Sequence, residues 1–292
     1  MDALYDAIVG GTTLRQIKRT SFQAGIEGQA LRQSGALDPS QIIVKGGEPR
    51  ITFESMDLSG VLTAISVSSG LFVNNAAITI PWNRRANGGT FAGGSNNFQL
   101  SALYGLFIPK SISASQGDDG AVVEIEGCIL SSDGLTVPVT ASVNNALGSQ
   151  AYSTAYAMGP MYIDSTQLLQ VESIKVDPGL TLVAKRFDGS VYPTLAFIQE
   201  RNPTIDITFE NFDALNTQGP LFASMTTAAA YFRKKVDGGT FVTDITAVHT
   251  KLSFGTGLKV VQSADASDTS NAKANIKLMG KVLTAALTST IP

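Results

Sequence analysis

The chain carries one segment twice: Trp82-Asn83-Arg84-Arg85-Ala86-Asn87-Gly88-Gly89-Thr90-Phe91 returns 150 residues later as Phe232-Arg233-Lys234-Lys235-Val236-Asp237-Gly238-Gly239-Thr240-Phe241. In both copies an aromatic residue and a basic pair precede a Gly-Gly-Thr-Phe motif, and the two segments align without a gap. Self-similarity at a long, fixed spacing is the signature of an internal repeat, and a repeat constrains the fold more than any local motif does.

Three further pairs of segments occur in the same order along the chain. Residues 51–57 (Ile-Thr-Phe-Glu-Ser-Met-Asp) match residues 207–213 at an offset of 156. At an offset of 154, Arg32, Gly35, Pro39 and Pro49 match Arg186, Gly189, Pro193 and Pro203, and Gly105-Leu106 match Gly257-Leu258 at 152. Four collinear blocks argue against coincidence. We therefore predict two tandem homologous domains, residues 1–165 and residues 166–292.

Each copy begins with a predicted β-hairpin. In the second copy, Asp188-Gly189 separates two β-favouring runs, and an Asp-Gly pair is a common two-residue hairpin turn because glycine accepts positive φ. The equivalent hairpin of the first copy lies within 22–47 and turns at Ser34-Gly35. The prolines that follow, Pro49 and Pro203, end the second arm because they have no N–H for a strand ladder.

Next comes a short alternating strand over 51–54, followed by a helix with apolar residues at Leu58, Val61, Leu62 and Ile65 and with Asp57 as its N-cap. In the second copy Gly219-Pro220 interrupts the helical pattern. The remaining strands are predicted at 76–82, 89–108 and 121–130, and at 226–235, 239–261 and 272–287. The predicted fold class is mainly β, with two tandem β-sandwich or split-barrel domains, each with a short α-helix and long β-hairpins.

Composition favours an assembled protein. Charged residues make up 15% of the chain and hydrophobic residues 43%, so much of the surface is polar but uncharged or apolar, which suits burial against neighbouring subunits. The net charge of −3 gives no basic field for holding nucleic acid. One cysteine, Cys128, excludes an intrachain disulfide and is expected to be a buried thiol. We expect no signal peptide and no membrane span.

No arrangement of residues predicts a reaction. The only histidine, His249, lies in a strand-like run, and we align it near Gln99 of the first copy, so the shared domain does not require an imidazole. The acidic loops lack the ligand spacing of a calcium loop, and neither Gly-Gly motif is followed by the Lys-Ser/Thr of a phosphate loop. We predict no catalytic residue, no cofactor and no metal site, and hence no enzyme.

The candidate contact residues are therefore those that recur in both copies. The basic pairs allow two interpretations, contact with a phosphate backbone or contact with carboxylates of a neighbouring subunit, and we favour the second. The candidates for intersubunit or lumen contacts are Arg84, Arg85, Lys234, Lys235, Gly88, Gly89, Gly238, Gly239, Arg32 and Arg186.

In its order of hairpin, Ile-Thr-Phe-Glu strand, Asp-capped helix and paired hairpins, the sequence resembles the tail tube proteins of bacteriophages. The duplication is similar to that of the trimeric tube proteins of long, non-contractile tails, in which six domains from three chains form a pseudo-sixfold ring. This resemblance implies a virion protein, assembled in the host cytoplasm, whose stacked rings surround a tape-measure protein and meet tail terminator and distal tail proteins. Double-stranded DNA would pass through the lumen without specific binding.

The resemblance also implies a lumen lined by strands at 22–33, 38–47, 180–187 and 191–200, with the hairpins around 88 and 238 as further candidates. Residues 133–165 have no clear match in the second copy, and we predict that they form the connector between the domains or an arm. Two other functions stay open. One is a different virion structural protein, in the capsid or elsewhere in the tail. The other is a two-domain carbohydrate-binding module that uses Trp82 as a stacking platform, although core packing is the favoured role for Trp82.

Overall fold

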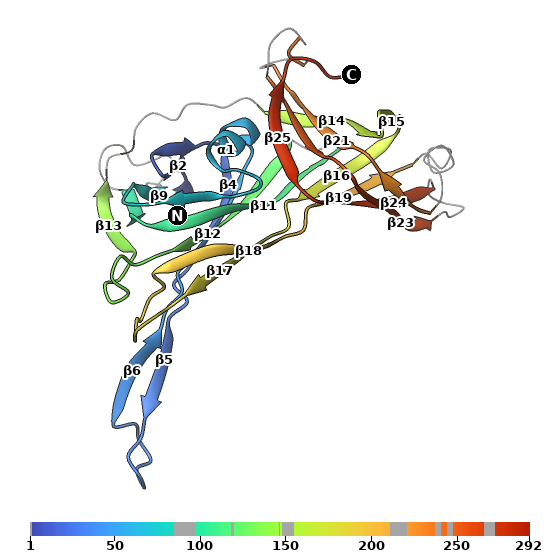
Figure 1. Ribbon diagram of the computed structural model, residues 1–292. Helices are drawn as coiled ribbons and strands as arrows, with labels where there is room; N and C mark the ends of the chain where they lie inside the picture. Colours follow the sequence, from blue (N-terminus) through green and yellow to red (C-terminus); the bar gives the residue numbers. More distant parts are fainter. Residues whose placement is uncertain are drawn as a thin grey trace.

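The computed structural model describes residues 2–84, 97–117, 120–145, 147, 155–210, 221–236, 241–243, 248–265 and 272–292. Antiparallel strands dominate these residues, and the one helix among them, α1 (Leu58–Ala64), has seven residues. The predicted mainly β fold class is confirmed. Three larger sheets form the body, and two separate hairpins lie beneath it (Figure 1).

Two of the larger sheets are local to one half of the chain. The first contains β1 (Asp2–Leu4), β2 (Ala7–Val9), β3 (Thr12–Leu14), β9 (Ile78–Arg84), β10 (Asn97–Ala102) and β13 (Thr140–Asn145). The second contains β14 (Tyr156–Ile163), β15 (Thr166–Leu168), β21 (Ala228–Lys234), β22 (His249–Phe254) and β25 (Leu283–Thr288). Their strand orders are β13-β10-β9-β2-β3, with β1 also on β9, and β25-β22-β21-β14-β15.

The third sheet contains ten strands and draws on both halves. The first half contributes β4 (Ile17–Gln23), β7 (Arg50–Ser55), β8 (Leu71–Val73), β11 (Gly105–Ser115) and β12 (Val122–Ile129). The second contributes β16 (Val171–Asp177), β19 (Thr204–Phe209), β20 (Phe222–Met225), β23 (Gly257–Asp265) and β24 (Lys273–Gly280). The order is β20-β23-β24-β19-β16-β11-β12-β7-β4, with β8 on β11, so β16 and β11 join the halves.

The second half repeats the strand order of the first, element by element. In the ten-stranded sheet, β8-β11-β12-β7-β4 corresponds to β20-β23-β24-β19-β16, and the two local sheets correspond likewise. The spacing is constant from β3 to β7: residues 12–14, 17–23 and 50–55 have counterparts at 166–168, 171–177 and 204–209, each at an offset of 154. The second round of strands begins at β14, ahead of residue 166, where the sequence predicted the second domain to start.

Pairing also corrects one of the sequence alignments. Ile51 pairs with Phe22, and the same position of the second half is Ile205, which pairs with Val176. The offset there is 154, so the alignment of residues 51–57 with 207–213 at 156 was wrong by two residues. A slip of two residues keeps every side chain on its original face of the strand, so the apolar alternation gave no warning of it.

The core lies on one face of the ten-stranded sheet. In β7 and β19 every second residue is buried, with Ile51, Phe53 and Ile207 among them. These side chains pack with residues of both local sheets and of α1 in one continuous cluster. The opposite face carries polar residues such as Thr52, Glu54 and Asp206, which are half-buried. This alternation is typical of an antiparallel sheet with one covered face.

The N-cap of α1 forms as predicted. The carboxylate of Asp57 accepts a hydrogen bond from the backbone N–H of Gly60 at 3.0 Å, which satisfies one of the free donors of the first turn. Leu58, Val61 and Ile65 are fully buried, so the apolar face of the helix packs on the core. The interruption expected at Gly219-Pro220 lies outside the described residues.

Both predicted hairpins form, but they end differently from a simple two-residue loop. β5 (Glu27–Leu31) pairs with β6 (Gln41–Gly46), and β17 (Leu180–Lys185) pairs with β18 (Leu195–Arg201). Asp188 and Gly189 have φ of 51° and 76°, and the N–H of Ser190 bonds to the carbonyl of Phe187 at 2.8 Å. The tight turn therefore lies at the tip of a nine-residue loop, 186–194, beyond the last ladder pair, Lys185 with Leu195.

Candidate assembly surfaces

The junction between the halves is an antiparallel pairing of β11 with β16. Ile112 and Ala114 face Val176 and Ile174, and these four side chains are buried in the core. Just beyond the ladder, the N–H of Gln116 donates to the carbonyl of Glu172 at 2.8 Å. Two copies of one sheet are thus joined edge to edge through backbone hydrogen bonds and an apolar face.

The counterparts of these two strands are β4 and β23. In the described part of the chain, each lacks a neighbouring strand along the stretch of edge that β16 and β11 use to pair with each other. At an offset of 154, β16 corresponds to β4, which within the described part of the chain pairs with β7 alone. β11 corresponds to β23. Among the described residues, β20 pairs with β23 at residues 257–260, the N–H of Val261 bonds to the carbonyl of Leu221, and the rest of β23 has no strand on this side. The chain therefore presents one edge of each kind, and an exposed edge strand is a template for pairing with another chain.

The outward backbone groups of β4 can be assigned by alternation. Glu172 directs its carbonyl across the junction, so Ile174 and Val176 also present their backbone groups to β11. The residues of β4 at the same positions are Thr20 and Phe22. Both are half-buried, and Phe22 packs against the core cluster from the edge of the sheet.

A second apolar cluster lies on the other face of the ten-stranded sheet, under the hairpin of the second half. Its members are buried residues of β11, β12 and the segment after β12, together with residues of β17 and β18: Leu106, Ile108, Cys128, Leu130, Leu180, Leu182 and Ala196. The hairpin β17–β18 therefore crosses the junction and covers part of the first half, beneath the large sheet in Figure 1.

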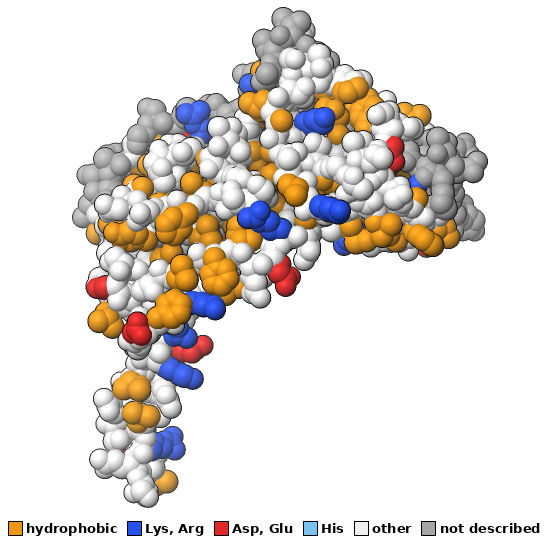
Figure 2. Space-filling view, viewed as in Figure 1, with side chains coloured by type: hydrophobic (Ala, Val, Ile, Leu, Met, Phe, Trp, Pro, Cys, Tyr) orange, Lys and Arg blue, Asp and Glu red, His pale blue; other side chains and the backbone are white. Residues whose placement is uncertain are grey.

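The hairpin of the first half covers nothing comparable within the described residues. β5 and β6 project from the body, and Ile42 and Val44 on β6 are 77% and 53% exposed (Figure 1). Leu258 on β23 and Met279 on β24 are both 37% exposed. Figure 2 shows hydrophobic side chains gathered on this face of the molecule over β23 and β24 and along the projecting hairpin.

Two predicted contact residues, Arg32 and Arg186, occupy equivalent loops with different surroundings. Arg32 is exposed in the loop at the tip of β5–β6. Arg186 lies against the base of that same hairpin, where its guanidinium fills the space that a side chain at Gly46 would need. Next to it, Tyr192 packs on Gly47, whose N–H donates to the carbonyl of Val191 at 2.9 Å.

The predicted basic pairs end two equivalent strands. Arg84 is exposed at the end of β9, and Lys234 is half-buried at the end of β21. Lys235 forms a bridge with Phe241, and its N–H bonds to the carbonyl of Ala155 at 2.8 Å. Among the described contacts, none joins Arg84 to Arg32 or to Arg186. Of the remaining candidates, Arg85, Gly88, Gly89, Gly238 and Gly239 lie outside the described residues.

His249 has a structural role that the sequence alignment misplaced. The backbone N–H of Lys234 donates to His249 Nδ1 at 3.2 Å, and in the first half the N–H of Arg84 donates to Asn97 Oδ1 at 3.0 Å. Both acceptor side chains are buried. The counterpart of His249 is therefore Asn97 and not Gln99, and both side chains satisfy a backbone donor at the end of the neighbouring strand.

Cys128 is the buried thiol that the sequence predicted. It is fully buried in the cluster under β17–β18. Burial raises the pKa of the thiol to about 12, and the carboxylate of Glu48 acts in the same direction. A thiol held in its protonated form is a poor nucleophile and a poor metal ligand.

The polar face of the ten-stranded sheet, where β17–β18 does not cover it, carries paired opposite charges. Glu126 on β12 accepts from Lys110 Nζ at 2.8 Å and also pairs with Arg50. Burial alone would raise the pKa of Glu126, but these two cations outweigh it and lower the pKa. Arg19 with Glu54, at 3.4 Å, is a further pair on this face. Opposite charges thus alternate here without forming a stripe of one sign.

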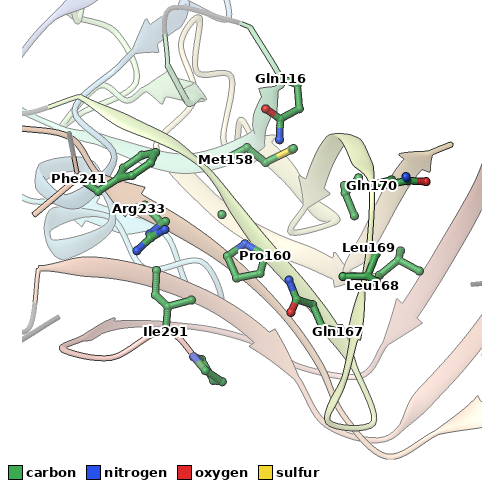
Figure 3. A pocket seen from close by; sticks show the side chains of 13 residues that line it. Gln116, Met158, Pro160, Gln167, Leu168, Leu169, Gln170, Arg233, Phe241 and Ile291 are labelled. Atoms are coloured by element: carbon green, nitrogen blue, oxygen red, sulfur yellow. The ribbon is translucent and has the colours of Figure 1, made fainter. Parts of the chain in front are cut away.

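An open pocket of 520 Å³ lies beside β14 and β15, near the C-terminus (Figure 3). Arg233 lines it, with the guanidinium carbon 4.7 Å from the ring centroid of Phe241. Among the described residues, the lining includes glutamines, aliphatic side chains and prolines but no carboxylate, imidazole, thiol or hydroxyl. It therefore offers neither a nucleophile nor an acid–base pair.

Trp82 does not form an open stacking platform. Its ring lies 5.4 Å from that of Phe98 on the neighbouring strand, and it packs partly against the core. In the described part of the chain, no cluster of three or more His, Cys, Asp or Glu side chains is arranged to hold a metal ion. The described residues also include no helix long and apolar enough to cross a membrane.

No established protein family has a sequence model that matches this chain, and no curated protein sequence matches it. The surfaces that distinguish the molecule are its two open strand edges, its projecting hairpin and the apolar patch on β23 and β24.

Proposed function

We propose that this chain is a tail tube protein of a bacteriophage with a long, non-contractile tail, and that three copies form a closed pseudo-sixfold ring. The observation that carries the proposal is the β11–β16 junction. It joins two copies of one sheet inside the chain. The counterparts of its two strands, β4 and β23, are open strand edges of the same two kinds. Repetition of the junction between chains, β23 on β4, is head-to-tail association.

Head-to-tail association ends either in a closed ring or in an open helix, depending on the rotation between neighbours. Closure pairs the open edges of β4 and β23 with each other, and barrels avoid uncontrolled pairing by the same kind of closure. The choice of three chains follows the resemblance to duplicated tube proteins. Stacked rings would form the tube, with the tape-measure protein inside it during assembly and the tail terminator and distal tail proteins at its ends.

The proposal assigns the lumen to the polar face of the ten-stranded sheet. The opposite face is covered by the two local sheets and α1, so it is not available to line a channel. The sequence had placed the lumen at the hairpin strands, and β17–β18 lies as a separate two-stranded sheet over part of this same polar face. Compensated pairs such as Lys110 with Glu126 would let DNA pass with weak and nonspecific attraction.

The test is the assembly state of the purified chain, measured by light scattering and negative-stain electron microscopy. We expect rings with a central channel, or tubes with a regular axial repeat. A chain that stays monomeric at all concentrations would contradict the proposal, and so would an oligomer without a channel.

A variant of the open edge sharpens this test. Thr20→Pro removes one outward N–H of β4 and leaves the ladder to β7 intact, because proline is tolerated on an edge strand when its nitrogen faces outward. We expect it to fold but to lose assembly. Thr20→Ile is the matched control, since isoleucine stands at the equivalent position, Ile174, in the paired strand, and it should assemble normally.

A further inference from the structure

We infer that the projecting hairpin β5–β6 docks on the apolar patch of β23 and β24 in a second copy of this chain. The inference rests on the proposed pairing of chains, and it specifies a contact that this pairing does not require. It follows from what the second hairpin, β17–β18, does within one chain: it covers β11 and β12 of the preceding half.

The surface that receives the hairpin is an apolar patch present in both halves. Pairing in the sheet makes Leu258 the counterpart of Leu106 and Met279 the counterpart of Cys128. Leu106 is 5% exposed and Cys128 is fully buried, whereas Leu258 and Met279 are both 37% exposed. The same apolar patch is thus covered in the first half and open in the second.

The projecting hairpin carries apolar residues at the positions that the packed hairpin uses. The ladder pair Ala184–Ala196 corresponds to Ala30–Ile42, and Leu182–Ile198 corresponds to Gly28–Val44. Ala196 is 7% exposed, and Ile198 packs against the covered patch. Their counterparts Ile42 and Val44 are apolar but largely exposed. Two open apolar surfaces therefore have counterparts that bury each other inside the chain.

Charge gives a third, independent argument. Arg186 lies against Gly46, and the offset of 154 converts this contact into Arg32 against Glu200 of the neighbouring copy. In the same way, the contact of Tyr192 with Gly47 becomes Asp38 against Arg201. All four residues are exposed in the single chain. The translated contacts bring opposite charges together twice, which favours this register over others.

The surface on which the hairpin docks has defined chemistry. It is formed by the β23–β24 face and the β18 end of a second chain, with an apolar centre and charged flanks. Burial of Ile42, Val44, Leu258 and Met279 removes exposed apolar surface of the kind that marks protein interfaces. Each chain would give its hairpin to one neighbour and receive the hairpin of the other, which is compatible with a closed ring.

The experiment is a charge exchange in the full chain. Arg32→Glu and Glu200→Arg should each lower the assembled fraction by about tenfold at low salt, and the double variant should restore it. Lys45→Glu is the matched control, since Lys45 lies on β6 but alternates to the face opposite Ile42 and Val44. Circular dichroism and thermal unfolding of the dilute monomers verify that all the variants fold alike.

The outcomes separate this inference from the proposed function. If the unmodified chain forms rings and the single charge variants form them equally well, the hairpin contact is wrong and the ring stands. If both single variants fail and the double variant is not restored, the specific pairing is wrong. If the unmodified chain forms no ring under any condition, both the ring and the hairpin contact are rejected.

Discussion

The apolar patch on β11 and β12 of the first half is covered by the hairpin β17–β18, whereas the equivalent patch on β23 and β24 of the second half is partly exposed in the described chain. Leu106 and Leu258 occupy the same position of the same strand, yet the hairpin β17–β18 buries the former and leaves the latter open. The halves also differ in their hairpins, one packed and one projecting (Figure 1). In a duplicated protein this difference is informative, because an internal contact provides a template for an external one.

The largest expected effect is on thiol reactivity. Cys128 and Met279 are equivalent positions, so Met279→Cys places a second thiol at the open copy of the patch. In dilute, monomeric protein we expect the new thiol to react with a thiol reagent more than a hundredfold faster, because Cys128 is exposed only through opening of the structure. The measurement is mass-resolved labelling over time.

The pH dependence of this labelling gives its control. The pKa of Cys128 is raised to about 12, so its thiol is still protonated in the folded chain at pH 9. The native chain, which has this cysteine alone, should remain unlabelled at pH 9 and become labelled after unfolding. Rapid labelling of the folded native chain at pH 9 would show that β17–β18 does not cover this patch.

The next largest effect concerns stability. Leu106→Ala removes a side chain buried between the sheet and β17–β18, and core truncations of leucine cost about 2–5 kcal/mol. Leu258→Ala truncates a side chain that is already partly in water, so we expect a loss below about 1 kcal/mol in the monomer. Denaturant unfolding at low protein concentration measures both. Equal losses would contradict the difference between the halves.

In the proposed ring this comparison should change. Docking of β5–β6 would bury Leu258, so Leu258→Ala should then weaken assembly although it barely affects the monomer. The same variant thus distinguishes the folding of a chain from the association of chains. Its assembled fraction, set beside that of Leu106→Ala at conditions where both fold, measures the contribution of the open patch.

The sequence predicted those features of the fold that depend on local chemistry. Asp57 caps a helix because a carboxylate satisfies free N–H groups, and Gly189 takes a positive φ because it has no Cβ. Both are decided by residues a few positions apart. The repeat was also visible, since the same order of basic and glycine residues follows Trp82 and Phe232 in the sequence.

What the sequence did not predict depends on pairing between distant strands. The β11–β16 junction depends on two strand edges that are complementary in three dimensions. The alternation of apolar residues does not reveal it, because this pattern is the same in an edge strand as in an inner one. The alignment at an offset of 156 failed for a related reason, because a slip of two residues preserves the apolar face. The candidate surfaces therefore emerged only when the pairing of each half was compared with the other.

The smallest expected effect tests the equivalence of His249 and Asn97. Each side chain is buried and accepts a hydrogen bond from a backbone N–H at the end of the neighbouring strand, Lys234 in one half and Arg84 in the other. His249→Ala leaves a buried donor unsatisfied, and such a loss costs about 1–3 kcal/mol. His249→Asn keeps an acceptor of the kind already used in the first half, so it should retain most of that stability. Thermal unfolding of the two variants decides the matter: if asparagine destabilises the chain as much as alanine does, the imidazole of His249 does more than its counterpart, and the two halves differ at this position in function as well as in sequence.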